Sequence, residues 1–213
     1  MSNTTEKNTT KTVAVQAGAQ NTGKARYLTV IALMAAISYI LAFLEVPMPL
    51  APSFARMDAS DVPALLTAFA LGPVAGTVVE LIKNVLQALS TSTGGIGELA
   101  NFLMGASLVF TAGLIYKQKK TRKMAVVSCV AGSVAMGIMA AIMNYFVLLP
   151  MYQIFMPIDQ VIASFAEIIP FIHTKLDVVL YSALPGNILK GLIVSVITML
   201  VYKRVSPAMK GMR

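Results

Sequence analysis

Six apolar runs, separated by prolines, glycines or basic residues, are the feature that most limits how this chain can fold. They cover residues 27–46, 62–71, 74–89, 96–116, 124–149 and 178–202. Hydrophobic residues make up 57% of the 213 residues and charged residues 12%, whereas about a quarter of the residues in a soluble domain are charged. Because a bilayer-spanning helix needs about 20 apolar residues, the pattern predicts an all-α membrane protein with six transmembrane helices.

The second and third runs are shorter than the others and carry polar residues, so we expect them to face protein or water rather than lipid. Gly72-Pro73 separates these two runs, and Pro150 is expected to end the fifth. Between the fifth and sixth runs, residues 157–172 place apolar side chains at helical spacing, with polar side chains off that stripe. This pattern predicts an interfacial helix along the membrane surface before the sixth span; a loop with chance periodicity is the alternative.

The flanks of the apolar region set the expected domain boundaries. Residues 1–24 are rich in Asn, Thr, Gln and Lys and have no apolar period, which predicts a disordered cytoplasmic tail. Residues 25–205 would form the six-helix membrane domain, and residues 206–213 a cytoplasmic C-terminal tail.

The net charge of +8 reflects topology rather than a surface for nucleic acid. In the six-span arrangement, thirteen Lys and Arg residues fall on one side, in residues 1–26, 117–123 and 203–213. Only Arg56 and Lys175 fall on the other side, while Lys83 and Lys190 lie within spans. The positive-inside rule therefore predicts that both termini are cytoplasmic.

Several functional classes are disfavoured by what the sequence lacks. One cysteine, Cys129, and one histidine, His173, give neither a disulfide framework nor a His-rich metal centre. The sequence has no G-x-x-x-x-G-K-[ST] phosphate loop and no G-x-S-x-G or H-E-x-x-H motif. We therefore expect no catalysis, no ATP hydrolysis by this chain, no metal and no cofactor.

Polar residues within the apolar runs are the natural candidates for a binding site, because an ionisable side chain at the bilayer centre costs about 2.5–3.5 kcal/mol on insertion scales. In the third run one helical face carries Glu80, Lys83 and Asn84, and Asn101 lies in the fourth run. Glu80 can pair with Lys83 or with Lys190. An internal ion pair that only fixes helix packing is the alternative to a ligand-binding role.

The sixth run holds the most site-like cluster. Asn187 and Lys190 lie one helical turn apart, directly after Pro185-Gly186, which frees backbone groups and allows close approach. Asn144, in the fifth run, carries an amide that can donate and accept at once, as the edge of a heterocycle requires.

Small residues at fourfold spacing mark a different kind of surface on the first run. Ala32 and Ala36 form a small-xxx-small pattern, which suits close helix packing. The partner would be either a helix of this chain or another membrane protein.

Together these strings resemble a known family. Asp58-Ala-Ser-Asp61-Val-Pro, then Phe69-Ala-Leu-Gly-Pro-Val-Ala-Gly76, then Glu80-Leu-Ile-Lys83-Asn84 are similar to riboflavin-specific S components, the substrate-binding membrane subunits of energy-coupling factor (ECF) transporters. Asn144 and the stretch Pro185-Gly-Asn187-Ile-Leu-Lys190 fit the same family. The resemblance extends over residues 27–203.

This resemblance implies that residues 25–205 bind riboflavin, as a transported ligand, in a bacterial cell membrane. The chain would assemble with a transmembrane coupling subunit and two cytoplasmic ATPases, and Ala32 and Ala36 would meet the coupling subunit. The loop 47–59 would cover the apolar ring with Met48, Leu50 and Phe54. Polar edges of the ligand would meet Asn144, Asn187 and Lys190, with further contacts from Glu80, Lys83, Asn84 and Asn101.

Three alternatives remain open from the sequence. The chain could be an S component for another vitamin. It could also be a stand-alone proton-coupled transporter that uses Glu80 and Lys83, or an intramembrane enzyme, although no nucleophile–base set is evident.

Overall fold

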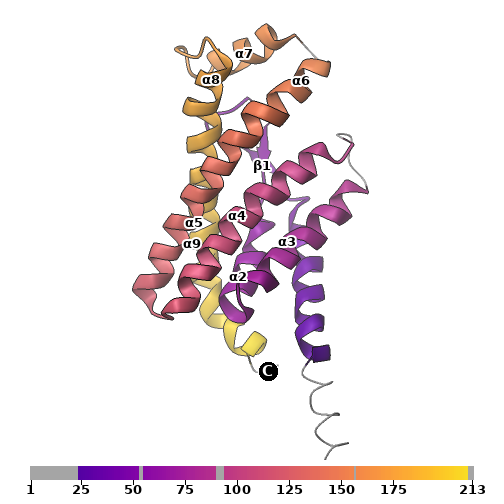
Figure 1. The fold of residues 1–213 in the computed structure, drawn as a ribbon, viewed down its shortest axis with the longest axis vertical. Helices are drawn as coiled ribbons and strands as arrows, with labels where there is room; N and C mark the ends of the chain where they lie inside the picture. The colour runs from indigo at the N-terminus through magenta and orange to yellow at the C-terminus, as the bar shows by residue number, and fades with distance from the viewer. Residues whose placement is uncertain (1–23, 53–54, 90–93, 156, 211–213) are drawn as a thin grey trace, which may run out of the picture.

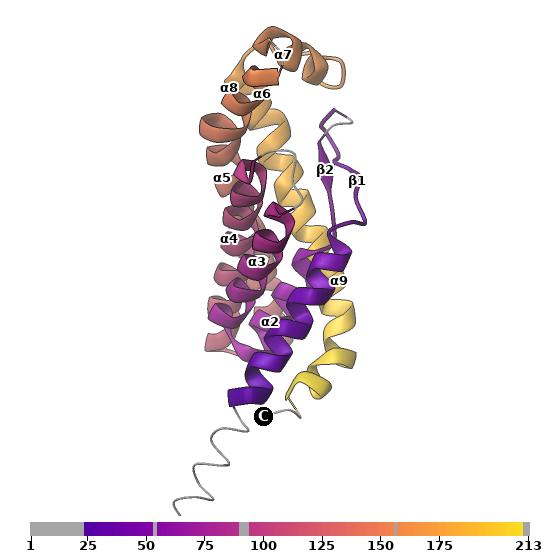
Figure 2. The same cartoon turned by 90° about the vertical axis from the view of Figure 1, so that its right-hand side faces the viewer.

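The computed structural model describes residues 24–52, 55–89, 94–155 and 157–210, and these residues fold largely into helices (Figures 1 and 2). The predicted tail at residues 1–24 lies outside the described residues except for Lys24, which opens the first helix, Lys24–Leu41. The start of this helix and the end of the last helix lie at the same end of the bundle (Figure 1).

Four helical segments are long and apolar enough to cross a membrane. They are Lys24–Leu41, Ile96–Gln118, Arg122–Ile154 and Lys175–Val205, and they match the first, fourth, fifth and sixth predicted spans. The second and third runs form shorter helices, α2 (Asp61–Leu71) and α3 (Pro73–Ala88). At about 1.5 Å per residue, the 16 residues of α3 extend about 24 Å, less than a bilayer's hydrocarbon thickness of about 30 Å.

The break between α2 and α3 falls where the sequence predicts it. Gly72 has a φ of 112°, a conformation that side chains disfavour, and Pro73 occupies the first turn of α3, where a missing N–H costs nothing. The two helices then pack tightly, because a Cβ on Gly76 would lie 2.6 Å from the carbonyl oxygen of Ala64.

Two π-helical segments interrupt the fifth and sixth spans. Helix α5 (Arg122–Met143) continues through η1 (Asn144–Leu148) into α6 (Leu149–Phe155). Helix α8 (Lys175–Val178) continues through η2 (Val179–Ala183) into α9 (Leu184–Lys210). The expectation that Pro150 ends the fifth helix is therefore wrong, since the π segment shifts the hydrogen-bond register and leaves this proline in the first turn of α6, where proline is tolerated.

Helix α4 (Ile96–Gln118) packs between α3 and α5, and α5 also packs along α9. The small residues of α5 allow this second contact. A Cβ on Gly137 would clash with Cγ1 of Ile188, and a Cβ on Gly191 would lie 2.9 Å from Oγ of Ser133. Helix α9 reaches Lys210, so residues 206–210 of the predicted C-terminal tail are helical.

A short hairpin, which the all-helical prediction did not include, follows the first helix. Strand β1 (Val46–Pro47) pairs with β2 (Arg56–Met57) in antiparallel register. The hairpin lies alongside α9 (Figure 2). Gly186 permits the close approach, because a Cβ there would lie 3.1 Å from Cε of Met48 and 3.3 Å from the carbonyl oxygen of Pro49.

The helix predicted between the last two spans is present as α7 (Ile158–Ala166). Its Val161 and Phe165 are buried against Leu149 of α6 and Val178 of α8. The apolar stripe thus packs largely on protein, and the position of α7 at a membrane surface stays a prediction. With α6 and α8, it covers the end of the bundle opposite to the C-terminus (Figure 1).

Candidate binding site

A cavity of about 320 Å³ lies between the hairpin, the two π segments and the N-terminal turns of α4 and α9. Its walls are partly apolar, from Met48, Met104, Leu148 and Phe165. Polar side chains converge on it from several elements: Glu45, Arg56, Asp58, Gln87, Asn101, Asn144, Tyr152, Ser182, Asn187 and Lys190. This combination of apolar walls with a few convergent polar groups is typical of a small-molecule site.

The π segments place two asparagines on this cavity. Asn144 is the first residue of η1, and its Nδ2 donates to the carbonyl oxygen of Ala140 at 2.8 Å. Asn187 follows η2 by one turn, and its Nδ2 donates to the carbonyl oxygen of Ala183, also at 2.8 Å. In both contacts the amide nitrogen is the donor, and an amide oxygen has two lone pairs, so both side chains are able to accept a hydrogen bond from a ligand.

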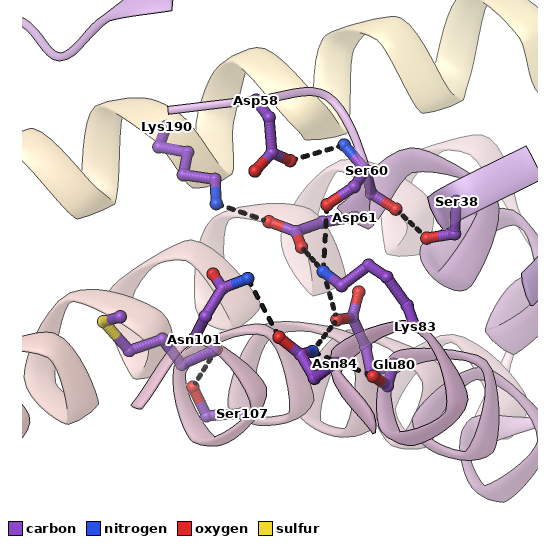
Figure 3. A network of polar contacts seen from close by, with 11 residues as sticks. Ser38, Asp58, Ser60, Asp61, Glu80, Lys83, Asn84, Asn101, Ser107 and Lys190 are labelled. Carbon is purple, nitrogen blue, oxygen red and sulfur yellow. Dashed lines mark hydrogen bonds and ion pairs between the residues drawn. The ribbon is translucent and has the colours of Figure 1, made fainter. Parts of the chain in front are cut away.

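Lys190 reaches the cavity from α9 with an ion pair behind it. Its Nζ lies 3.0 Å from Oδ2 of Asp61, at the start of α2 (Figure 3). An ammonium carries three donors, so Lys190 can satisfy this carboxylate and still donate to a ligand in the cavity.

The same carboxylate binds a second lysine from the other side. Nζ of Lys83 lies 2.9 Å from Oδ1 of Asp61, 2.7 Å from Oε2 of Glu80 and 2.9 Å from Oγ of Ser60. All of these side chains are fully buried. Gly105 of α4 makes room for the carboxylates, since a Cβ there would lie 2.8 Å from Oε2 of Glu80.

From Glu80 the network returns to the cavity. Nδ2 of Asn84 donates to the carbonyl oxygen of Glu80 at 2.8 Å, and Nδ2 of Asn101 donates to Oδ1 of Asn84 at 3.1 Å (Figure 3). Asn101 itself lines the cavity. An arc of polar side chains thus begins at Lys190, runs behind the wall and ends at Asn101, so that both of its ends face the same space.

The structure separates the predicted site residues into three groups. Asn144, Asn187, Lys190, Asn101 and Met48 line the cavity. The next group, Glu80, Lys83 and Asn84, lies in the buried network behind its wall.

The remaining two predicted contacts are in the loop. Leu50 exposes its side chain and does not line the cavity, but its carbonyl oxygen accepts a hydrogen bond from Oγ of Ser182 at 2.5 Å. Phe54 lies outside the described residues.

One expected pairing is not the one observed. The sequence left Glu80 as the carboxylate that offsets Lys190, but the structure gives this role to Asp61, because α2 enters the bundle between α3 and α9. The sequence pattern alone assigns no partner to Asp61. A usable signal was present, since it is a carboxylate that opens an apolar run and needs a partner as much as Glu80 does.

Ala32 and Ala36 both lie on the exposed face of the first helix, whereas Ala35 is buried. Leu28, Leu33 and Ile40 are also exposed on this helix. The two small residues therefore belong to an outward-facing apolar surface and do not pack against described parts of this chain.

Comparison with known proteins gives a consistent result. The pattern of the family described as "ECF transporter, substrate-specific component" matches residues 26–202. The chain is 37% identical to the riboflavin transporter RibU of Staphylococcus aureus (strain TCH60), over 86% of this chain and 92% of that protein. It is 31% identical to the riboflavin transporter FmnP of Bacillus subtilis (strain 168), over 89% of this chain and 97% of that protein.

Among solved structures, the S component of a bacterial ECF transporter superposes with a TM-score of 0.69 at 35% identity, covering 88% of this chain and 99% of that one. The helical fold is thus that of a membrane transport subunit. The chain belongs to the family of substrate-specific components of ECF transporters.

Replacing Asp61 should test how far the fold depends on its carboxylate. Asp61→Asn leaves Lys83 with Glu80 alone and Lys190 with no carboxylate, and loss of one partner from a buried ion pair costs about 3–5 kcal/mol. We expect a clear fall in the thermal unfolding temperature of the purified protein in detergent.

The matched control is Asp159→Asn, which removes an exposed carboxylate from α7 and should change stability by no more than about 0.5 kcal/mol. Equal unfolding temperatures for the two variants would show that the Asp61 pairs do not stabilise the fold.

Proposed function

We propose that this chain is the riboflavin-binding subunit of an ECF-type uptake transporter and that the 320 Å³ cavity holds the vitamin. The observation that carries the proposal is the convergence of Asn144, Asn187 and Lys190 on one partly apolar cavity. The two relatives named above, described as riboflavin transporters, support the choice of ligand.

The lining fits the chemistry of riboflavin. The ligand is neutral and combines a broad apolar ring with an imide-like edge and a polyol chain. Met48, Leu148 and Phe165 supply apolar surface for the ring, while the amide oxygens of Asn144 and Asn187 accept from N–H or O–H groups. Lys190 donates to a ring carbonyl or nitrogen. A ligand lacking these groups leaves buried polar atoms unpaired, which is costly and so gives selectivity.

The charges around the cavity suit an uncharged ligand. Lys190 is paired with Asp61, Lys83 is paired with Asp61 and Glu80, and Arg56 at the cavity is paired with Glu45. Lys190 therefore acts as a directed hydrogen-bond donor and does not demand an anionic ligand.

Glu80 and Lys83 act on the ligand through other residues. Both are fully buried, bound to each other and to Asp61 or Asn84, and neither lines the cavity. This arrangement supports a positioning role for the pair and gives no support to a proton-coupled transporter that uses them.

In the membrane, α2 and α3 complete a six-span domain within residues 25–205, and both termini are cytoplasmic. The thirteen basic residues on one side of the chain support this orientation, as does the position of the described chain ends at one end of the bundle (Figure 1). The remainder, residues 1–24 and 206–213, lie in the cytoplasm, and α7 lies near the outer surface.

Energy for uptake comes from ATP hydrolysed by two cytoplasmic partner subunits, connected through a transmembrane coupling subunit. The absence of a phosphate loop from the sequence supports this division of labour. The exposed Ala32 and Ala36 provide the surface on which a helix of the coupling subunit packs.

The binding residues are tested by equilibrium titration with riboflavin, followed by quenching of flavin fluorescence. Replacing a buried hydrogen-bonding group should leave its ligand partner unpaired at a cost of about 1–3 kcal/mol. Lys190→Ala and Asn187→Ala should therefore each weaken binding by about 5- to 150-fold. Lys117→Ala, at an exposed position that does not line the cavity, serves as the control and should bind like the wild type.

Wild-type affinity in both site variants would remove α9 from the binding site. Binding of another vitamin in preference to riboflavin would overturn the ligand while leaving the family assignment intact.

The partner surface is tested separately from the ligand site. Ala36→Trp places a large side chain where a partner helix must approach closely, so co-purification with the coupling subunit and cellular uptake of riboflavin should be lost. Riboflavin binding to the isolated subunit should persist, because residue 36 does not line the cavity. Ile138→Trp, at an exposed position on α5, is the control and should assemble normally, whereas normal assembly of Ala36→Trp would contradict the proposal.

A further inference from the structure

A second cavity lies at the opposite end of the bundle from the proposed riboflavin site. It has a volume of about 430 Å³ and opens between α2, the turn that joins α4 to α5, and α9. Its walls are apolar or aromatic, from Phe69, Tyr116, Ala125, Val126, Met199 and Tyr202. The proposed uptake function leaves this groove without a role.

Three cations stand on the rim of this apolar groove. Lys120 and Arg122 come from the turn and the start of α5, and Lys203 comes from α9; all three are exposed. Among the described residues no carboxylate lines the groove and none of these three cations forms an ion pair. The groove thus presents uncompensated positive charge above an apolar wall.

Where the groove lies favours a lipid as its occupant. It sits at the ends of two segments long and apolar enough to span a bilayer, Ile96–Gln118 and Lys175–Val205, so its rim falls near the depth of the phospholipid phosphates. Basic pockets between transmembrane helices on the cytoplasmic side bind anionic headgroups. The segment 1–23 of this chain is a poor fit, since it carries Lys7 and Lys11 against a single Glu6.

We propose that this groove binds an anionic phospholipid. Lys120, Arg122 and Lys203 hold the phosphate, and an acyl chain lies against Phe69, Ala125 and Met199. No residue of Lys24–Leu41 lines the groove, so lipid binding here does not compete for the surface of Ala32 and Ala36.

The test uses the full-length chain, delipidated in a neutral detergent and titrated with phosphatidylglycerol or phosphatidylcholine. Native mass spectrometry counts the lipids bound to each chain. We expect one phosphatidylglycerol to bind in preference to phosphatidylcholine. The triple variant Lys120→Gln, Arg122→Gln, Lys203→Gln should weaken this binding by about a hundredfold, because each basic residue near an anionic headgroup contributes about fivefold.

The control is a second triple variant, Lys117→Gln, Lys119→Gln, Lys123→Gln, which removes the same charge from neighbouring residues outside the groove and should keep most of the affinity. Ala125→Trp fills the apolar wall while keeping every cation, and it should also lose the lipid. Riboflavin binding and the thermal unfolding temperature both report whether each variant is folded. Only riboflavin binding depends on the proposed function, so the unfolding temperature checks the fold even if that proposal fails.

Four results would overturn the proposal. One is equal binding of the two lipids, and another is equal loss in the two triple variants, which would mean a diffuse charge effect. The third is displacement of the lipid by free glycerol 1-phosphate, which would reduce the groove to a phosphate site. A groove variant that keeps its lipid but no longer assembles with the coupling subunit would assign the groove to that partner instead.

Discussion

The pairing of the Asp61 carboxylate with two lysines is the interaction on which the rest of the site depends. One oxygen pairs with Lys83 and the other with Lys190, so a single side chain of α2 joins α3 to α9. In surroundings of low dielectric constant, an uncompensated ammonium is far more costly than in water. The two lysines therefore constrain where α2 can lie, and α2 in turn fixes where Lys190 meets the cavity.

Small residues make this arrangement sterically feasible. Gly105 leaves room for the carboxylates of Glu80 and Asp61 against α4, and Gly76 lets α3 approach α2. On the other side of the cavity, Gly186 lets the loop with Met48 close onto α9. The polar network depends on these glycines. Buried charges must be paired at hydrogen-bond distance, and bulky side chains at the glycine positions would hold the helices too far apart for that.

The two π segments and the two prolines that follow them explain how one cavity is opened between long helices. In each case a proline stands two residues beyond the π segment, Pro150 after η1 and Pro185 after η2. The altered hydrogen-bond register brings Asn144 and Ser182 onto the cavity. Such segments are often found at functional sites, and here they contribute Asn144, Leu148, Ser182 and Ala183 to the cavity lining.

Sequence reasoning predicted the helices well because apolar runs and glycine or proline breaks are local signals. It also identified five of the cavity-lining residues, since polar side chains in apolar runs are conspicuous. It missed the hairpin, whose strands have only two residues each, and it misjudged Pro150, because the register shift in η1 has no simple sequence signal. Asp61 was overlooked as the partner of Lys190, since helical periodicity tells which residues share a face but not which helix faces them.

The most direct test of this account is a double-mutant cycle between Asp61 and Lys190, read as the dissociation constant for riboflavin. If Asp61 acts on the ligand by positioning Lys190, the variant with both Asp61→Asn and Lys190→Gln should bind no more weakly than Lys190→Gln alone. The coupling free energy should then be of the size found for residues in contact, about 0.5–3 kcal/mol. If the fold-losses of riboflavin affinity in the two single variants multiply in the double variant, the two residues act independently. That result would contradict the central role of the Asp61 carboxylate.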